Sequence, residues 1–153
     1  MNTETVNAEN AETLILELRR FFPVSRERLF AAWTDPAEVR QWFGCKTCVD
    51  ARVDLRPGGS YLISSKNHED EICTAVGEYR EVTPPSRLVY TWRWEGDSDW
   101  DGVESVVTVE FNEQPGGTEM HLTHRGFPSA ESRGRHEQGW TGVMEKLGDF
   151  VQG

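Results

Sequence analysis

Two histidines in the last third of the chain are the side chains best suited to proton transfer. His124 ends a segment in which apolar residues alternate, and His136 lies in a later segment with helical spacing, four residues before Trp140. Because an imidazole titrates near neutral pH, both rings, together with the phenol of Tyr90, are candidates for acid/base catalysis. The sequence supplies no recognisable nucleophile with its base, and an inward histidine is more often a hydrogen-bonded core residue, so the catalytic residues stay unassigned.

Large apolar and aromatic side chains accompany these histidines. Six tryptophans are many for 153 residues, and alternation along the predicted strands turns most of the aromatic rings inward. If the strands and the last helix close over a pocket, its lining consists of Trp33, Trp42, Phe43, Tyr61, Tyr79, Tyr90, Trp92, Trp94, Met120, Leu122, His124, His136, Trp140 and Met144. The alternative is that these side chains pack into a solid core, and the residues alone favour that alternative.

A C-x-x-C pattern at Cys45 and Cys48 matches a redox pair or half of a zinc site. Zinc needs two further ligands, for which Cys73 and His68 are only loosely placed. A redox pair of the thioredoxin type stands where a helix begins, whereas this one follows a helix-ending glycine, Gly44. We interpret the pattern as accidental, with redox sensing as the alternative, and expect neither a metal nor a cofactor.

Three aspartates, Asp97, Asp99 and Asp101, imitate the first half of a calcium-binding loop. The last position of such a loop carries a glutamate, but the residue there is Thr108, and strands rather than helices flank the segment. The segment is therefore predicted to be an acidic hairpin tip, with weak cation binding as the alternative.

The composition indicates one globular domain that avoids polyanionic partners. A chain of 153 residues buries a single core without disulfides, and 26 acidic against 16 basic residues give a net charge of −10. Such a charge repels nucleic acid and anionic lipid. No apolar run is long enough for a membrane span, the first residues are polar and acidic, and three cysteines form no disulfide framework. We expect a cytoplasmic protein without nucleic-acid or membrane partners.

Hydrophobic periodicity predicts an α+β domain over residues 13–153, after a flexible tail at residues 1–12. An initial strand from about residue 14 ends at Pro23, and two short helices follow, capped by Ser25 and Asp35. Six strands and a terminal helix come next, predicted at 49–55, 59–66, 71–82, 86–95, 103–112 and 117–124 for the strands and 129–151 for the helix. Their short connections predict an antiparallel meander.

Motifs from about residue 14 to 151 carry a family resemblance. They are Phe22-Pro23-Val24-Ser25, Leu29–Pro36, Trp42-Phe43-Gly44, Asp54–Tyr61, Gly77–Trp92 and His136–Trp140. In these motifs and in the order of its elements, the chain resembles the family named after the activator of the Hsp90 ATPase, within the START and Bet v 1-like superfamily. The resemblance implies a helix-grip fold, in which a curved antiparallel sheet of about seven strands surrounds a long C-terminal helix.

The resemblance also implies that the domain binds a small hydrophobic or aromatic molecule in a cavity between sheet and helix. With it, a pocket becomes the favoured interpretation of the inward aromatic residues. Two other classes stay open: an enzyme that uses the same cavity, as the similar polyketide cyclases do, and an interaction protein that forms a homodimer or contacts a chaperone. In the eukaryotic activator this domain follows a separate chaperone-binding domain, for which the chain has no room, so chaperone contact is not expected.

Overall fold

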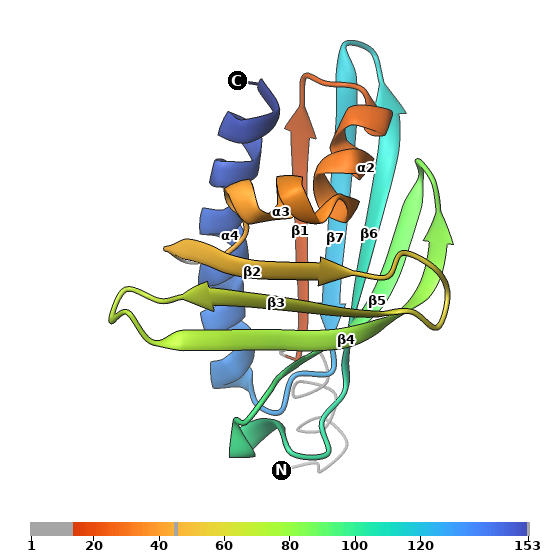
Figure 1. The fold of residues 1–153 in the computed structure, drawn as a ribbon. Coiled ribbons are helices and arrows are strands. Elements are labelled where there is room, and N and C mark those ends of the chain that lie inside the picture. Colours follow the sequence, from red (N-terminus) through yellow and green to blue (C-terminus); the bar gives the residue numbers. More distant parts are fainter. Residues whose placement is uncertain (1–13, 45, 153) are drawn as a thin grey trace, which may run out of the picture.

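The computed structural model describes residues 14–44 and 46–152, and the tail predicted at residues 1–12 lies outside this part of the chain. Seven strands and three α-helices make up the described fold (Figure 1). Their bounds are β1 Ile15–Phe22, α2 Arg26–Thr34, α3 Pro36–Trp42, β2 Thr47–Val53, β3 Ser60–Lys66, β4 Ile72–Thr83, β5 Arg87–Trp94, β6 Ser105–Gln114, β7 Gly117–Arg125 and α4 Ala130–Gln152. A short 3-10 turn, η1 Ser98–Trp100, lies between β5 and β6.

Side-chain caps define the two short helices. The Ser25 hydroxyl accepts a hydrogen bond from the backbone N–H of Arg28 at 3.1 Å and begins α2. Asp35 then serves both helices: its backbone N–H closes the last turn of α2, and its carboxylate accepts the N–H of Ala37 to begin α3. Both predicted caps are confirmed, and they place the aromatic residues of α2 and α3 over the sheet.

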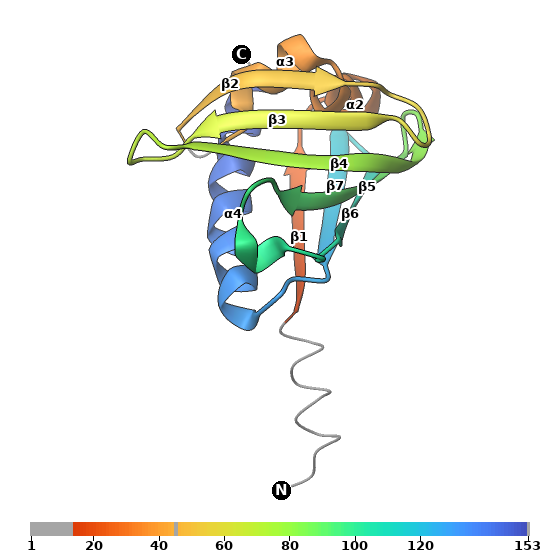
Figure 2. The same cartoon turned by 60° about the horizontal axis from the view of Figure 1, so that its bottom comes forward.

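The strands form one antiparallel sheet in the order β1-β7-β6-β5-β4-β3-β2. Each strand from β2 to β6 therefore pairs with the next strand in sequence, as the short connections predict, and β1 joins the edge beside β7. The sheet is strongly curved: in Figures 1 and 2, β2, β3 and β4 cross over β1, β6 and β7, and α4 runs beside β1 beneath them. The helix contacts β1, α2 and α3. The predicted helix-grip fold is confirmed.

The ends of the strands are determined by pairing with the neighbouring strand more than by the alternation of apolar and polar residues. The structure begins β2 at Thr47, two residues before the predicted start, because Thr47 pairs with Lys66 of β3. Similarly, β6 extends to Gln114, which pairs with Gly117 across the hairpin turn. Alternation nevertheless assigns the faces correctly, since Val107, Val109, Phe111, Leu122 and His124 are almost completely buried on the concave side.

Candidate functional site

Aromatic rings fill the space between the concave face of the sheet and the helices. Trp140 of α4 lies against Trp33, Phe43 and Trp92, with ring centroids 5.9, 5.7 and 5.5 Å away. None of these four side chains is more than 7% exposed. The free space left among the neighbouring rings measures about 20 Å³, which is room for one water molecule. The side chains predicted to line a pocket are thus packed against one another in this structure.

This small void lies beside the two short helices and is rich in phenols. Its lining consists of Trp33, Val39, Phe43, Tyr61, Ile63, Tyr79, Leu88 and Tyr90. Burial raises the pKa of all three tyrosine hydroxyls, so they are neutral donors at pH 7. The Tyr61 hydroxyl donates to the carbonyl of Thr91 at 2.5 Å, whereas those of Tyr79 and Tyr90 bond to no other described residue.

Two indole N–H groups in this interior have no acceptor. Trp33 Nε1 and Trp92 Nε1 are buried and bond to none of the described residues. Their side chains are only 5% and 3% exposed, so solvent reaches neither ring freely. An unpaired buried donor costs about 1–3 kcal/mol, which makes two in one aromatic cluster a feature that calls for an acceptor.

His124 lies at the centre of a hydrogen-bond chain that joins three strands to α4. The Ser105 hydroxyl donates to the carbonyl of Trp92 at 2.6 Å and accepts from His124 Nε2 at 2.8 Å. The other ring nitrogen, Nδ1, accepts from Trp140 Nε1 at 3.1 Å. One donating and one accepting nitrogen define a neutral imidazole. Burial lowers the pKa of His124 well below its ordinary value, and the neighbouring His136 lowers it further.

His136 is also a neutral imidazole, because one ring nitrogen accepts and the other donates a hydrogen bond. Aromatic rings surround it. Its Nε2 accepts from Trp94 Nε1 at 2.8 Å, and its Nδ1 donates to the carbonyl of Ser132 at 2.7 Å. Trp100 and Phe127 lie against the ring, with centroids at 5.4 and 4.9 Å. Burial is the main cause that lowers the pKa of His136. Both nitrogens of both histidines are therefore engaged, and neither ring offers a free nitrogen for proton transfer to a substrate.

The other predicted lining residues belong to the surrounding core. Trp42 packs on Trp33 and Phe43, and its Nε1 donates to the carbonyl of Ala32 at 3.0 Å. Three aliphatic side chains of the set are at most 3% exposed and do not border the void: Met120, Leu122 and Met144.

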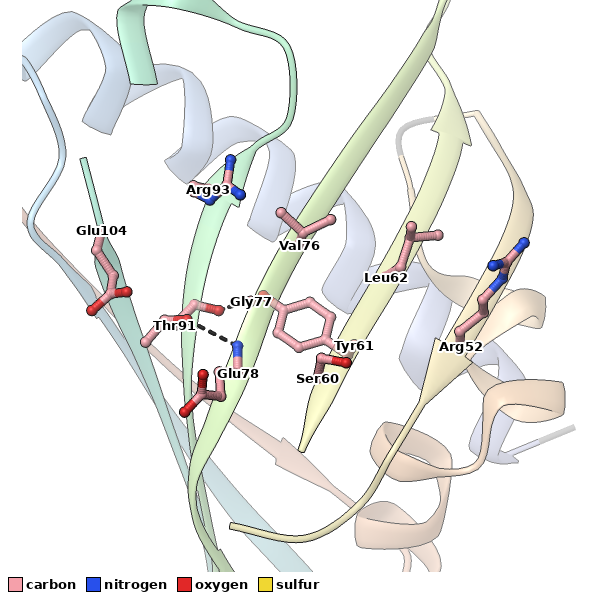
Figure 3. A pocket seen from close by; sticks show the side chains of 10 residues that line it. All are labelled: Arg52, Ser60, Tyr61, Leu62, Val76, Gly77, Glu78, Thr91, Arg93 and Glu104. Atoms are coloured by element: carbon pink, nitrogen blue, oxygen red, sulfur yellow. Dashed lines mark hydrogen bonds between the residues drawn. The ribbon is translucent and has the colours of Figure 1, made fainter. Parts of the chain in front are cut away.

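A larger pocket, which sequence reasoning missed, opens on the outer face of the sheet (Figure 3). Its volume is about 480 Å³, and its lining consists of Arg52, Ser60, Tyr61, Leu62, Val76, Gly77, Glu78, Thr91, Arg93 and Glu104. It lies where the pairing of β4 with β5 is interrupted: Val76 pairs with Arg93 and Tyr79 with Tyr90, but the Glu78 N–H donates to the Thr91 hydroxyl instead of the ladder. No motif signals such a break.

Gly77 makes this interruption possible. A Cβ atom at Gly77 would lie 2.0 Å from the carbonyl oxygen of Thr91 and 2.7 Å from the ring of Tyr61. The Tyr61 phenol thus reaches between the strands from the concave side, and Tyr61 borders both the inner void and the outer pocket.

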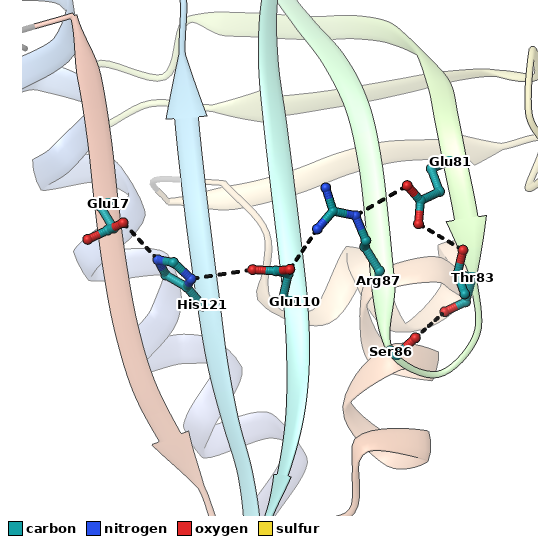
Figure 4. A network of polar contacts seen from close by, with 7 residues as sticks. All are labelled: Glu17, Glu81, Thr83, Ser86, Arg87, Glu110 and His121. Carbon is teal, nitrogen blue, oxygen red and sulfur yellow. Dashed lines mark hydrogen bonds and ion pairs between the residues drawn. The ribbon is translucent and has the colours of Figure 1, made fainter.

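A row of polar contacts crosses the outer face of β1, β7, β6, β5 and β4 (Figure 4). His121 Nε2 lies 2.9 Å from a carboxylate oxygen of Glu17, and its Nδ1 lies 3.5 Å from Glu110. Arg87 bridges Glu110 and Glu81 at 2.6 and 3.2 Å. His121 and Glu110 are cross-strand partners on β7 and β6, so this row follows the register of the sheet.

The remaining motifs add no site among the described residues. Cys45 lies outside the described part of the chain, and Cys48 is buried, with a pKa that burial raises. Asp97 caps η1 by accepting the N–H of Asp99. Across residues 14–44 and 46–152, no group of three or more His, Cys, Asp or Glu side chains is placed to hold a metal ion. The helices in these ranges fall short of the length and apolarity that crossing a membrane requires.

Comparisons with known proteins agree with the fold. The family described as activator of Hsp90 ATPase homolog 1-like protein matches residues 23–152. The activator of 90 kDa heat shock protein ATPase homolog 1 of Homo sapiens is 26% identical over 129 residues, which cover 84% of this chain and 34% of the human protein. The chain thus spans about a third of that relative's length.

Solved structures match over nearly the whole chain. The AHSA1 protein from Silicibacter pomeroyi is 31% identical, with a TM-score of 0.78 over 90% of this chain and 97% of that one. A protein from Chromobacterium violaceum superimposes with a TM-score of 0.82 over 92% of this chain and 98% of that one, at 22% identity. The second likeness concerns the fold alone.

Proposed function

The chain belongs to the family of activator of Hsp90 ATPase homolog 1-like proteins, and we propose that it binds a small aromatic molecule carrying a hydrogen-bond acceptor in the interior between sheet and α4. The observation that supports this proposal is the pair of buried indole N–H groups, Trp33 Nε1 and Trp92 Nε1, that lack an acceptor. An acceptor such as a ketone oxygen would satisfy a donor that the protein leaves unpaired.

Binding requires a side chain to move, because the void of about 20 Å³ is too small for an aromatic ring. Phe43 is the best placed to move. It caps the C-terminus of the seven-residue helix α3, it borders the void, and its ring centroid lies 5.9 Å from that of Trp92. Gly44 follows at a φ of 95°, a conformation that few other residues adopt. Displacing Phe43 would extend the void from Trp33 toward Trp92.

The linker after Phe43 is held to α4 by one lysine. Lys146 Nζ donates to the carbonyl of Gly44 at 2.9 Å and to that of Lys46 at 3.4 Å. In the proposal, this contact fixes the closed arrangement and breaks or adapts when Phe43 swings away. Binding rather than catalysis is favoured because His124 and His136 use both ring nitrogens in hydrogen bonds within the protein.

Acetophenone and ethylbenzene form a matched test, since they share a shape but only the ketone accepts a hydrogen bond. We expect acetophenone to raise the unfolding temperature more than ethylbenzene, with a stabilisation of about 2.7 kcal/mol when the ligand is at a hundred times its Kd. Phe43→Leu should strengthen binding of both compounds, because it leaves more room beside the void. Trp33→Phe and Trp92→Phe should reduce the preference for the ketone.

The exposed Phe21 of β1 supplies a control, because Phe21→Leu removes an aromatic ring that is 49% exposed, far from the void. This variant should respond to both compounds as the parent protein does. If neither compound stabilises the parent protein or Phe43→Leu, the interior is a solid core and the proposal is wrong.

A further inference from the structure

The outer pocket follows from the register of the sheet and from the glycine at position 77. Its floor consists of two cross-strand rows that the register defines: Arg93, Val76, Leu62 and Arg52 in one, and Thr91, Glu78 and Ser60 in the other. Any side chain at Gly77 would collide with the Thr91 carbonyl, so the break between β4 and β5 is compatible only with glycine there. The volume of about 480 Å³ lies within the range of small-molecule sites.

Some charged side chains around this pocket form ion pairs, and others do not. Arg52 is paired with Asp50 at 3.1 Å, and Glu104 with Arg80 at 2.8 Å. In contrast, the guanidinium of Arg93 and the carboxylate of Glu78 form no ion pair and no side-chain hydrogen bond with another described residue. One free positive and one free negative group thus face the same pocket.

These two free groups are close but do not meet. Val76 pairs with Arg93 and Glu78 lies opposite Thr91, so Arg93 and Glu78 are diagonal neighbours on adjacent strands. Diagonal positions lie about 7–8 Å apart at the Cα atoms, within reach of a molecule that bridges two long side chains. In Figure 3, Arg93 and Glu78 both lie on the β5 side of β4, and Leu62 lies beyond Val76.

We propose that the outer pocket binds a zwitterion with an apolar body, of the chemical class of α-amino acids with aliphatic side chains. The carboxylate of the ligand pairs with Arg93, its ammonium pairs with Glu78, and its side chain lies on Leu62 and Val76. The charge pattern selects this class. A simple anion would face Glu78 and a net charge of −10, and a simple cation would face the guanidinium of Arg93.

Three probes that share the leucine side chain but differ in their charged groups test the proposal: L-leucine, N-acetyl-L-leucine, which lacks the ammonium, and L-leucinamide, which lacks the carboxylate. Binding is followed by the backbone amide NMR signals of Gly77, Glu78 and Arg93 during titration. We expect leucine to bind most tightly and each analogue roughly threefold to fivefold more weakly, as for exposed charge pairs. Glycine should also bind more weakly than leucine, because it has no side chain to cover Leu62 and Val76.

Two substitutions assign the charges. Arg93→Gln should weaken binding of leucine and N-acetylleucine but not of leucinamide, and Glu78→Gln should weaken binding of leucine and leucinamide but not of N-acetylleucine. Arg19→Gln on β1 and Glu113→Gln on β6 remove the same charges elsewhere and should change nothing. Absence of shifts with leucine, tighter binding of either analogue than of leucine, or equal effects of the control substitutions would each overturn the proposal.

Discussion

At the scale of single residues, the interior depends on two neutral imidazoles. His124 joins β5, β6, β7 and α4 through Ser105, Trp92 and Trp140, and His136 joins α4 to β5 through Trp94. A second proton on either ring would place an N–H against the indole N–H of a tryptophan. Both pKa values are lowered, chiefly by burial, so the folded state binds protons less readily than the unfolded chain.

This difference predicts that stability falls as the medium becomes acidic. Above the ordinary histidine pKa of 6.5, both rings are neutral in the folded and in the unfolded chain, and they contribute fully to the free energy of unfolding. Below it, the unfolded chain takes up protons that the folded state excludes, and the free energy of unfolding should decrease by up to about 1.4 kcal/mol per pH unit for each ring. Urea unfolding at several pH values between 7.5 and about 5.5 measures this slope.

The variant His136→Gln removes one of the two titrating rings and should flatten the slope. A slope that His136→Gln does not alter would show that other groups cause the acid sensitivity.

At the scale of elements, Gly77 of β4 and Gly142 of α4 affect stability in opposite ways. Gly77 permits the break between β4 and β5, since a Cβ there would lie 2.0 Å from the Thr91 carbonyl oxygen. Gly142 lies on the exposed side of α4, and a Cβ there would meet nothing within 4 Å. Gly134 and Gly139 also face open space, whereas a Cβ at Gly148 would lie 3.1 Å from the guanidinium of Arg20.

The two sites therefore respond differently to alanine. Gly77→Ala should destabilise the protein by more than about 2 kcal/mol, because backbone and the Tyr61 ring must both shift. Gly142→Ala should stabilise it by about 0.5–1 kcal/mol, since alanine restricts the unfolded chain and favours the helix. Thermal and urea unfolding of both variants test this contrast. A mild effect of Gly77→Ala would mean that the strands can separate further at this point.

At the scale of the whole molecule, the sequence predicts the architecture better than the interior. Period-two alternation and the turn residues identify every strand, and the caps at Ser25 and Asp35 identify both short helices. These signals are local. Whether aromatic rings leave a cavity depends on how side chains from distant segments, such as Phe43 and Trp140, fit together, and composition does not encode that volume. The outer pocket was missed for a related reason, since Gly77 reads as an ordinary strand glycine until Tyr61 and Thr91 are placed beside it.

Net charge is the other property that belongs to the molecule as a whole, and it predicts a response to salt. With 26 acidic and 16 basic residues, the folded chain repels itself, while its ion pairs lie at the surface, where each contributes little. Raising NaCl from about 10 mM to about 200 mM shortens the screening length to less than a third, so repulsion should weaken more than the pairs do. We expect the unfolding temperature to rise by roughly 2–4 °C. Asp99→Asn with Asp101→Asn changes the net charge from −10 to −8 at exposed positions and should reduce that rise. A fall in unfolding temperature with salt would instead show that ion pairs such as those of Arg87 outweigh the net repulsion.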